Sequence, residues 1–107
     1  MTTFDQREEG FENMFAHDEE VKFKADARRN RMVGFWAAEK LGLAGAAAEA
    51  YARSVIDANV EAPGGRAVIR KIATDLAAKN VIEPESTIQA KMDELLTIAI
   101  AQIKAGM

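Results

Sequence analysis

The scarcity of chain breakers constrains this sequence more than any other feature. Its 107 residues contain only two prolines, Pro63 and Pro84, and the first is followed by two glycines. The stretches between them are rich in alanine, leucine, lysine and glutamate, which favour helices. No stretch alternates apolar and polar residues in the manner of a strand. The sequence therefore predicts an all-α fold, a four-helix bundle preceded by an N-terminal arm.

Local end signals divide this helical sequence into segments. A glycine or asparagine beyond the last apolar turn marks a helix end, and we expect such ends at Gly42 and Asn80. The bundle helices are predicted over residues 18–41, 44–59, 66–79 and from Pro84 to about 103. A separate N-terminal segment is predicted over 3–17. We accordingly divide the chain into an arm, residues 1–20, and a bundle, residues 21–107.

Charge is strongly polarised at the N-terminal end. Residues 1–20 carry seven acidic side chains and one arginine, a net charge of −6. Residues 21–31 carry five basic side chains and one aspartate, a net charge of +4, although the whole chain has a net charge of only −3. At helical spacing, Phe4, Phe11 and Phe15 fall in one narrow stripe of the arm.

This arm has two interpretations. In the first, the phenylalanine stripe folds back on the bundle as an ordinary amphipathic helix. In the second, the arm is mobile and becomes helical in the groove of a partner, where the phenylalanines are anchors. A short acidic segment does not form a stable helix alone, and Gly10 weakens it further. We therefore favour a flexible or conditionally helical arm.

Composition excludes several classes of function. The chain has no cysteine, so it has no disulfide, thiolate metal site or cysteine nucleophile. The only histidine is His17. By itself it does not make a metal site, and no Ser–His–Asp arrangement can be argued around it. We expect His17 to face solvent or cap a helix, and its most specific role is a pH-sensitive joint. Carboxylate pairs such as Glu8 and Glu12 are expected to be solvated. The chain is not expected to be an enzyme or to hold a cofactor or metal.

The basic stretch that follows the arm interleaves cations with aromatic residues. Such a pattern occurs in nucleic-acid-binding proteins, but Met32, Phe35 and Trp36 have the spacing of core residues and the chain is acidic overall. No nucleic-acid partner is expected. The glycine turn over 62–65 is interpreted as a turn first and a weak phosphate contact second. The residues assigned to a weak contact with ATP, ADP or an acidic partner are Lys24, Arg28, Arg29, Arg31 and Arg66.

Four stretches of the sequence carry a family resemblance. They are residues 4–8 (FDQRE), 15–18 (FAHD), 23–31 (FKADARRNR) and 34–42 (GFWAAEKLG). On these stretches the chain resembles the zeta subunit family of ATPase inhibitors, found on bacterial rotary F-type ATP synthases. The resemblance covers essentially the whole chain, and its N-terminal third is the specific part. The departures from the family pattern are Met14, Met32, Val33 and Phe35.

The resemblance implies a mechanism. The arm would enter the interface between catalytic and non-catalytic subunits, reach toward the central shaft, become helical there and block rotation in the hydrolytic direction. The bundle would dock outside. The resemblance implies that the anchors are Phe4, Phe11, Met14 and Phe15, and that the charged residues setting register are Asp5, Arg7, Glu8 and Glu12. The polar, acidic N-terminus and the lack of a long apolar run favour a cytoplasmic protein without membrane insertion of its own. The resemblance adds that it would be peripheral on the membrane-bound synthase.

Two alternatives come from other classes of function. The first is a helical adaptor that binds a partner through a face of its bundle, with the arm merely solvated. Helical content in the free arm, and packing of Phe11 and Phe15 on the bundle, would favour it. The second is a weak nucleotide-sensing protein that uses the basic residues of 24–31 or the turn before Arg66.

Overall fold

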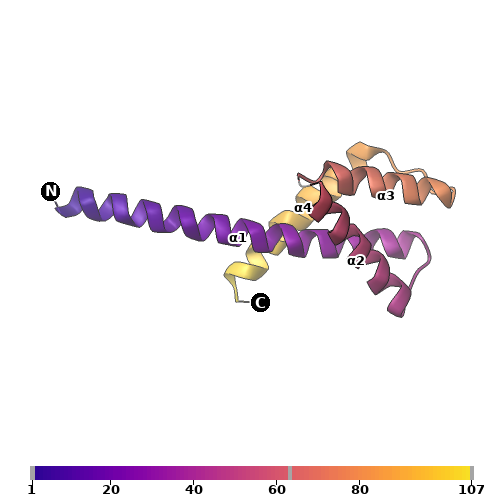
Figure 1. The fold of residues 1–107 in the computed structure, drawn as a ribbon, viewed down its shortest axis with the longest axis horizontal. Helices are drawn as coiled ribbons and strands as arrows, with labels where there is room; N and C mark the ends of the chain where they lie inside the picture. Colours follow the sequence, from indigo (N-terminus) through magenta and orange to yellow (C-terminus); the bar gives the residue numbers. More distant parts are fainter. Residues whose placement is uncertain (1, 63, 107) are drawn as a thin grey trace.

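The computed structural model describes the backbone of residues 2–62 and 64–106, and the side chains of this range from residue 19 onward. The chain forms four helices, α1 (Thr2–Lys40), α2 (Gly45–Glu61), α3 (Arg66–Ala78) and α4 (Glu85–Lys104), as Figure 1 shows. The described residues contain no strand. The predicted all-α, four-helix fold is confirmed.

The ends of α1 and α3 lie where the sequence predicts them. Gly42 and Asn80 both adopt the left-handed conformation, with φ of +77° and +63°. Glycine and asparagine tolerate this conformation better than other residues. It turns the chain so that later N–H groups reach the last carbonyls of the helix: Leu43 N–H donates to the Ala38 oxygen at 2.9 Å. These helix ends are therefore set by local chemistry.

The N-terminal end of the chain differs from the prediction. The segments expected over 3–17 and 18–41 form the single continuous helix α1. No glycine or proline lies between residues 11 and 33, and the Lys24 ammonium pairs with the Glu20 carboxylate one turn earlier at 3.1 Å. Extending an existing helix requires far less ordering than starting a new one. The bundle supplies the nucleus, and the helix then continues toward the N-terminus.

The core lies where α1 crosses α2 and α4, with α3 closing one end. Its largest fully buried apolar side chains are Val33, Val55, Val68, Ile72, Leu76, Ile88 and Met92. Small residues allow a close contact between α1 and α2: a Cβ on Gly34 would lie 2.7 Å from the Ala52 Cα. Close packing of α1 on α2 therefore depends on a glycine in the middle of a helix, where helix propensity alone disfavours it.

The N-terminal part of α1 extends away from the other three helices, as Figure 1 shows. The molecule is accordingly elongated, with principal extents of 63 × 25 × 22 Å. Among the described side chains, the first buried one along the chain is Val21. The description of side chains starts at residue 19, so this observation does not test the division predicted at residue 20.

Candidate partner-binding site

The arm residues assigned by sequence lie outside the described side chains. Only the backbone is described for this segment, and it is helical. The structure therefore assigns no contact to these side chains, which are Phe4, Asp5, Arg7, Glu8, Phe11, Glu12, Met14 and Phe15. The pH-sensitive joint proposed at His17 falls in the same segment. The structure adds that the backbone of the arm belongs to α1, which continues without a break into the bundle.

The basic residues that follow the arm point to different partners. Lys24 pairs with Glu20, and Arg28 Nη1 donates to Gln102 Oε1 on α4 at 3.3 Å. The Arg31 guanidinium lies over the Phe35 ring, 5.0 Å from its centroid. These three cations recur about one turn apart on one side of α1. They line a common hollow of about 580 Å³, together with Phe23, Ala27, Ile56 and Ile103. We call Lys24, Arg28 and Arg31 the basic belt.

Arg29 is turned toward the interior. Its Nε and Nη2 donate to Asn30 Oδ1 at 3.2 and 3.1 Å, and its Nη1 lies 3.6 Å from the Asp26 carboxylate. Asn30 is the one polar residue that is buried among the described side chains. Arg29 therefore satisfies a buried acceptor, which would otherwise cost roughly 1–3 kcal/mol. Its first role is structural.

Beside Arg29 lies an apolar hollow of about 690 Å³ between α1, the end of α2 and α4, which we call the Phe23 groove. Its principal lining residues are Phe23, Asn30, Ile56, Asn59, Val60 and Leu96. The Phe23 and Val60 side chains are 77% and 72% exposed. Inside the molecule, Asn59 Oδ1 is buried and accepts no hydrogen bond within the described part of the chain. The groove thus places two exposed apolar side chains beside the charged side chains of Lys22, Asp26 and Arg29.

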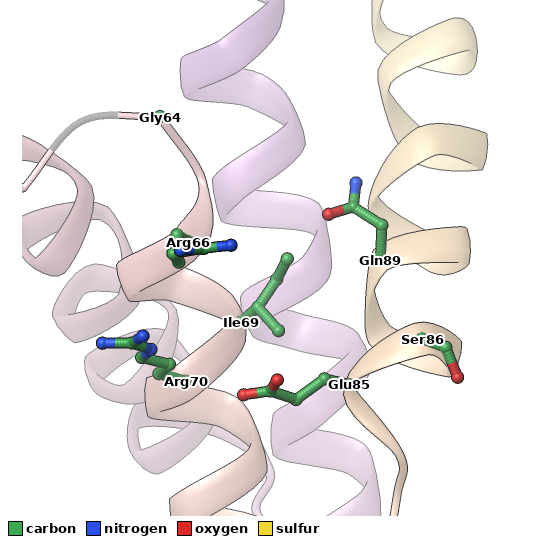
Figure 2. Close-up of a pocket in the computed structure, with 7 residues that line it drawn as sticks. All are labelled: Gly64, Arg66, Ile69, Arg70, Glu85, Ser86 and Gln89. Atoms are coloured by element: carbon green, nitrogen blue, oxygen red, sulfur yellow. The ribbon is translucent and has the colours of Figure 1, made fainter.

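Arg66 lies in a different place from the other assigned cations. It lines a polar hollow of about 410 Å³ between α3 and α4, shown in Figure 2. Arg66 and Arg70 come from α3, whereas Glu85, Ser86 and Gln89 come from α4. Both arginines are exposed. The turn before Arg66 is confirmed, with Gly65 in the left-handed conformation at the start of α3. Of the assigned cations, Lys24, Arg28 and Arg31 therefore line one hollow, whereas Arg29 and Arg66 line two others.

A polar link joins α2 to α3 away from these surfaces. Tyr51 Oη donates to Asp75 Oδ2 at 2.9 Å, and Lys71 Nζ donates to the same oxygen at 3.0 Å. Burial is the main cause that raises the pKa of Tyr51 above its ordinary value, and the hydrogen bond to Asp75 and its negative charge add to it. The neutral phenol is therefore the form that the folded protein favours.

Replacement of Tyr51 by phenylalanine is expected to lower the free energy of unfolding by about 1 kcal/mol at neutral pH, because one partly buried hydrogen bond is lost. Since the folded state raises the pKa, the stabilisation is present below the unfolded value of about 10 and is lost as pH rises above it. Urea unfolding at pH 7 and pH 11 would test this. The wild type should lose more stability than Tyr51→Phe at the higher pH; equal losses would contradict the assignment.

Two further classes of site are absent from the described residues. None of the described helices is both long and apolar enough to cross a membrane. In the same part of the chain, no group of three or more histidine, cysteine, aspartate or glutamate residues is placed to hold a metal ion.

Comparison with known proteins decides the family. The model of the family described as ATPase inhibitor subunit zeta matches residues 1–102, which includes the arm, the basic belt and all but the end of α4. The chain belongs to the ATPase inhibitor subunit zeta family. The resemblance found in the sequence is therefore confirmed. Membership assigns the chain to inhibitors of an ATPase, which are regulators rather than enzymes, and implies association with an ATP synthase.

A solved structure supports the fold of this zeta family member. The chain is similar to one described as a solution NMR structure, with 41% sequence identity and a TM-score of 0.69. The match covers 81% of this chain and 99% of that chain. A comparison with curated proteins finds no significant match. The four-helix arrangement is therefore shared with a related chain.

The sequence analysis did not predict the Phe23 groove. Phe23 lies in the basic stretch that was considered for its charge, for nucleic-acid binding and for the family resemblance, and Val60 lies just beyond the predicted helix 44–59. At helical spacing both are ordinary apolar residues. One signal was available: Val60 is followed within three residues by the Pro-Gly-Gly break, so little chain remains to cover it.

Proposed function

We propose that this zeta subunit blocks ATP hydrolysis by inserting its N-terminal arm, residues 1–20, as a helix at a catalytic interface of a bacterial rotary F-type ATP synthase. The observation that carries the proposal is the continuity of α1. The same helix that packs in the bundle carries the acidic, phenylalanine-striped segment outward from it. The proposed partners are the catalytic, non-catalytic and central shaft subunits.

Continuity of the helix supports this function in two ways. A helix held at one end by the bundle loses less conformational freedom on binding than a free segment of the same sequence. The bundle, docked outside, also keeps the arm at high local concentration near its site. The arm blocks hydrolysis and spares synthesis only if it binds one rotational state better than the others, because equal affinity for all states shifts no population.

The anchors of this proposal are the aromatic side chains of the arm. Replacing Phe11 or Phe15 by alanine is expected to weaken inhibition by about 30-fold each, since loss of a buried aromatic anchor costs about 2 kcal/mol of binding. The test is the concentration that halves ATP hydrolysis by the catalytic head of the cognate synthase. Ile82→Ala is the matched control, because Ile82 is 78% exposed in the loop between α3 and α4. Equal inhibition by all three variants would refute the assignment of the anchors.

A further inference from the structure

The hollow lined by the basic belt combines positive charge with apolar surface. Among the described residues, its lining consists of the three belt cations and four apolar residues, with no acid: Phe23, Lys24, Ala27, Arg28, Arg31, Ile56 and Ile103. Phe23 is 77% exposed, and Lys24 and Arg31 are exposed as well. Like charges one helical turn apart disfavour a helix, and exposed apolar area is unfavourably hydrated. Folding of the monomer therefore does not account for this surface, whereas a bound partner would.

The neighbours of Lys24 and Arg31 leave these two charges accessible to a partner. The Lys24 ammonium pairs with Glu20, but the two side chains are 59% and 64% exposed. Exposed pairs of this kind contribute little to stability, so a carboxylate of a partner can replace Glu20. The Arg31 guanidinium lies over the Phe35 ring, which carries no net charge. Both cations can therefore pair with acidic groups without disturbing the core.

The spacing of the charges indicates the form of the occupant. Lys24 and Arg31 are seven residues apart, which is about 10 Å along the axis of α1. Two or three carboxylates at this spacing, with an apolar side chain between them, would pair with the cations and cover Phe23. An acidic amphipathic segment of a protein has this chemistry, and acids one turn apart on a helix repeat the spacing.

The arm excludes a broad anionic surface as the occupant. Residues 1–20 have a net charge of −6 and lie on the same helix as the belt. Lys24 is only four residues, about 6 Å, beyond the end of the arm. A lipid bilayer or a nucleic acid, which is anionic over a wide area, would repel the arm while it attracted the belt. The acids of the partner must therefore be local, as on one segment of a protein.

The position of the belt indicates which protein carries this segment. Family membership implies association with an ATP synthase, and α1 runs from the arm directly into the belt. A protein surface around the entry point of the arm would therefore meet the belt next. We infer that the basic belt and Phe23 bind an acidic amphipathic segment on the outside of the catalytic head, beside the point where the arm enters. This inference rests on the proposed function, and the contact keeps the arm at high local concentration.

Binding of the full chain to the immobilised catalytic head, followed by interferometry with MgATP present, tests the charges. The double variant Lys24→Gln, Arg31→Gln should bind about tenfold more weakly at low salt and lose less affinity when salt is added. The control Arg53→Gln, Lys79→Gln removes the same charge from exposed positions outside the hollow and should bind like the wild type. No binding by the wild type would defeat the proposed function itself. Unchanged binding by the belt variant, beside a wild type that binds and inhibits, would overturn only the inference.

Glu20 provides a test in the opposite direction. Because its carboxylate competes with the partner for Lys24, Glu20→Gln should tighten binding to the head by about threefold. The control Glu49→Gln makes the same change of net charge at an exposed position of α2 and should leave the affinity unchanged. A purely structural role for the belt would not produce tighter binding. Equal affinities of Glu20→Gln and Glu49→Gln would contradict the inferred pairing of Lys24.

The apolar part of the contact is tested by two exposed side chains in neighbouring hollows. Phe23 lines the hollow of the basic belt, whereas Val60 lines only the Phe23 groove. Phe23→Ser should weaken binding to the head by about tenfold, since an exposed aromatic anchor is removed. Val60→Ser should change it by less than about twofold. Equal weakening by both variants would place the contact in the Phe23 groove and overturn the choice of hollow.

Cross-linking identifies the segment. Carbodiimide joins an amine to a carboxylate in contact with it, and Glu20→Gln frees Lys24 from its own neighbour. Peptide mass spectrometry of this variant on the head should show Lys24 joined to an aspartate or glutamate of a head subunit; no such product would count against the inference. Vesicles of phosphatidylcholine with one part in three of phosphatidylglycerol test the lipid alternative. Vesicle binding that the belt double variant loses, with its binding to the head unchanged, would assign the belt to a lipid surface and overturn the inference.

Discussion

A chain lacking residues 1–19 is expected to keep its folded bundle and to lose its inhibition of ATP hydrolysis completely. Every buried side chain among the described residues lies at Val21 or later, so the truncation removes no described core contact. The free energy of unfolding should change by no more than about 0.5 kcal/mol, as for other surface changes. The affinity for the synthase should fall sharply, because the truncated chain lacks the arm residues that the proposal assigns to binding.

Two measurements separate these effects. Circular dichroism with urea unfolding reports the bundle, and ATP hydrolysis by the cognate catalytic head reports inhibition. A synthetic peptide of residues 1–19 is a useful companion, since the proposal predicts that it inhibits weakly without the bundle. Full inhibition by the truncated chain would contradict the assignment of inhibition to the arm. The alternative function, an adaptor that binds a partner through a face of the bundle, would then be the better explanation.

Replacing Gly34 by alanine is expected to destabilise the protein by about 1–3 kcal/mol, because the new methyl group overpacks the contact between α1 and α2. The new Cβ would lie 2.7 Å from the Ala52 Cα and 3.1 Å from the Ala52 Cβ. Since the first of these neighbours is backbone, the two helices must move apart. Helix propensity alone predicts the opposite, a gain of about 1 kcal/mol from removing a glycine inside a helix.

The sign of the measured change therefore decides between propensity and packing. Urea unfolding of Gly34→Ala gives the sign, and Ala50→Gly, at an exposed position of α2, measures propensity alone. That control should lose about 1 kcal/mol. If Gly34→Ala proved more stable than the wild type, the close approach of α1 to α2 would not exist in solution.

Most of the fold was predictable because its signals are local. Gly42, Asn80 and the Pro-Gly-Gly break end helices through their own backbone preferences, whichever partners surround them. The boundary expected near residue 17 was not found, because Gly10 and a run of acids weaken a helix without breaking it. A helix already nucleated by the bundle extends through such a segment.

The candidate site was predictable only in part. The acidic, phenylalanine-rich arm is evident from the sequence, and the family match over residues 1–102 supports its importance. The roles of the cations were less accessible. The sequence analysis assigned both Arg29 and Lys24 to a contact with a nucleotide or an acidic partner. In the structure, the Arg29 guanidinium turns inward to Asn30, whereas the Lys24 ammonium pairs with Glu20. Which cations face solvent depends on where α2 and α4 cover α1.

The residue pattern predicts α2, α3 and α4, the C-terminal end of α1 and the polarised charge of α1, because each depends on residues within a few turns of one another. Three features become visible only in the packed helices. They are the unbroken course of α1 from the arm into the bundle, the close approach of Gly34 to Ala52, and the exposure of Phe23 and Val60 beside the buried Asn59 oxygen, which has no partner within the described residues. These features depend on segments that are distant in the sequence. Burial and close contact are properties of the packed helices together, so no single stretch of the chain encodes them.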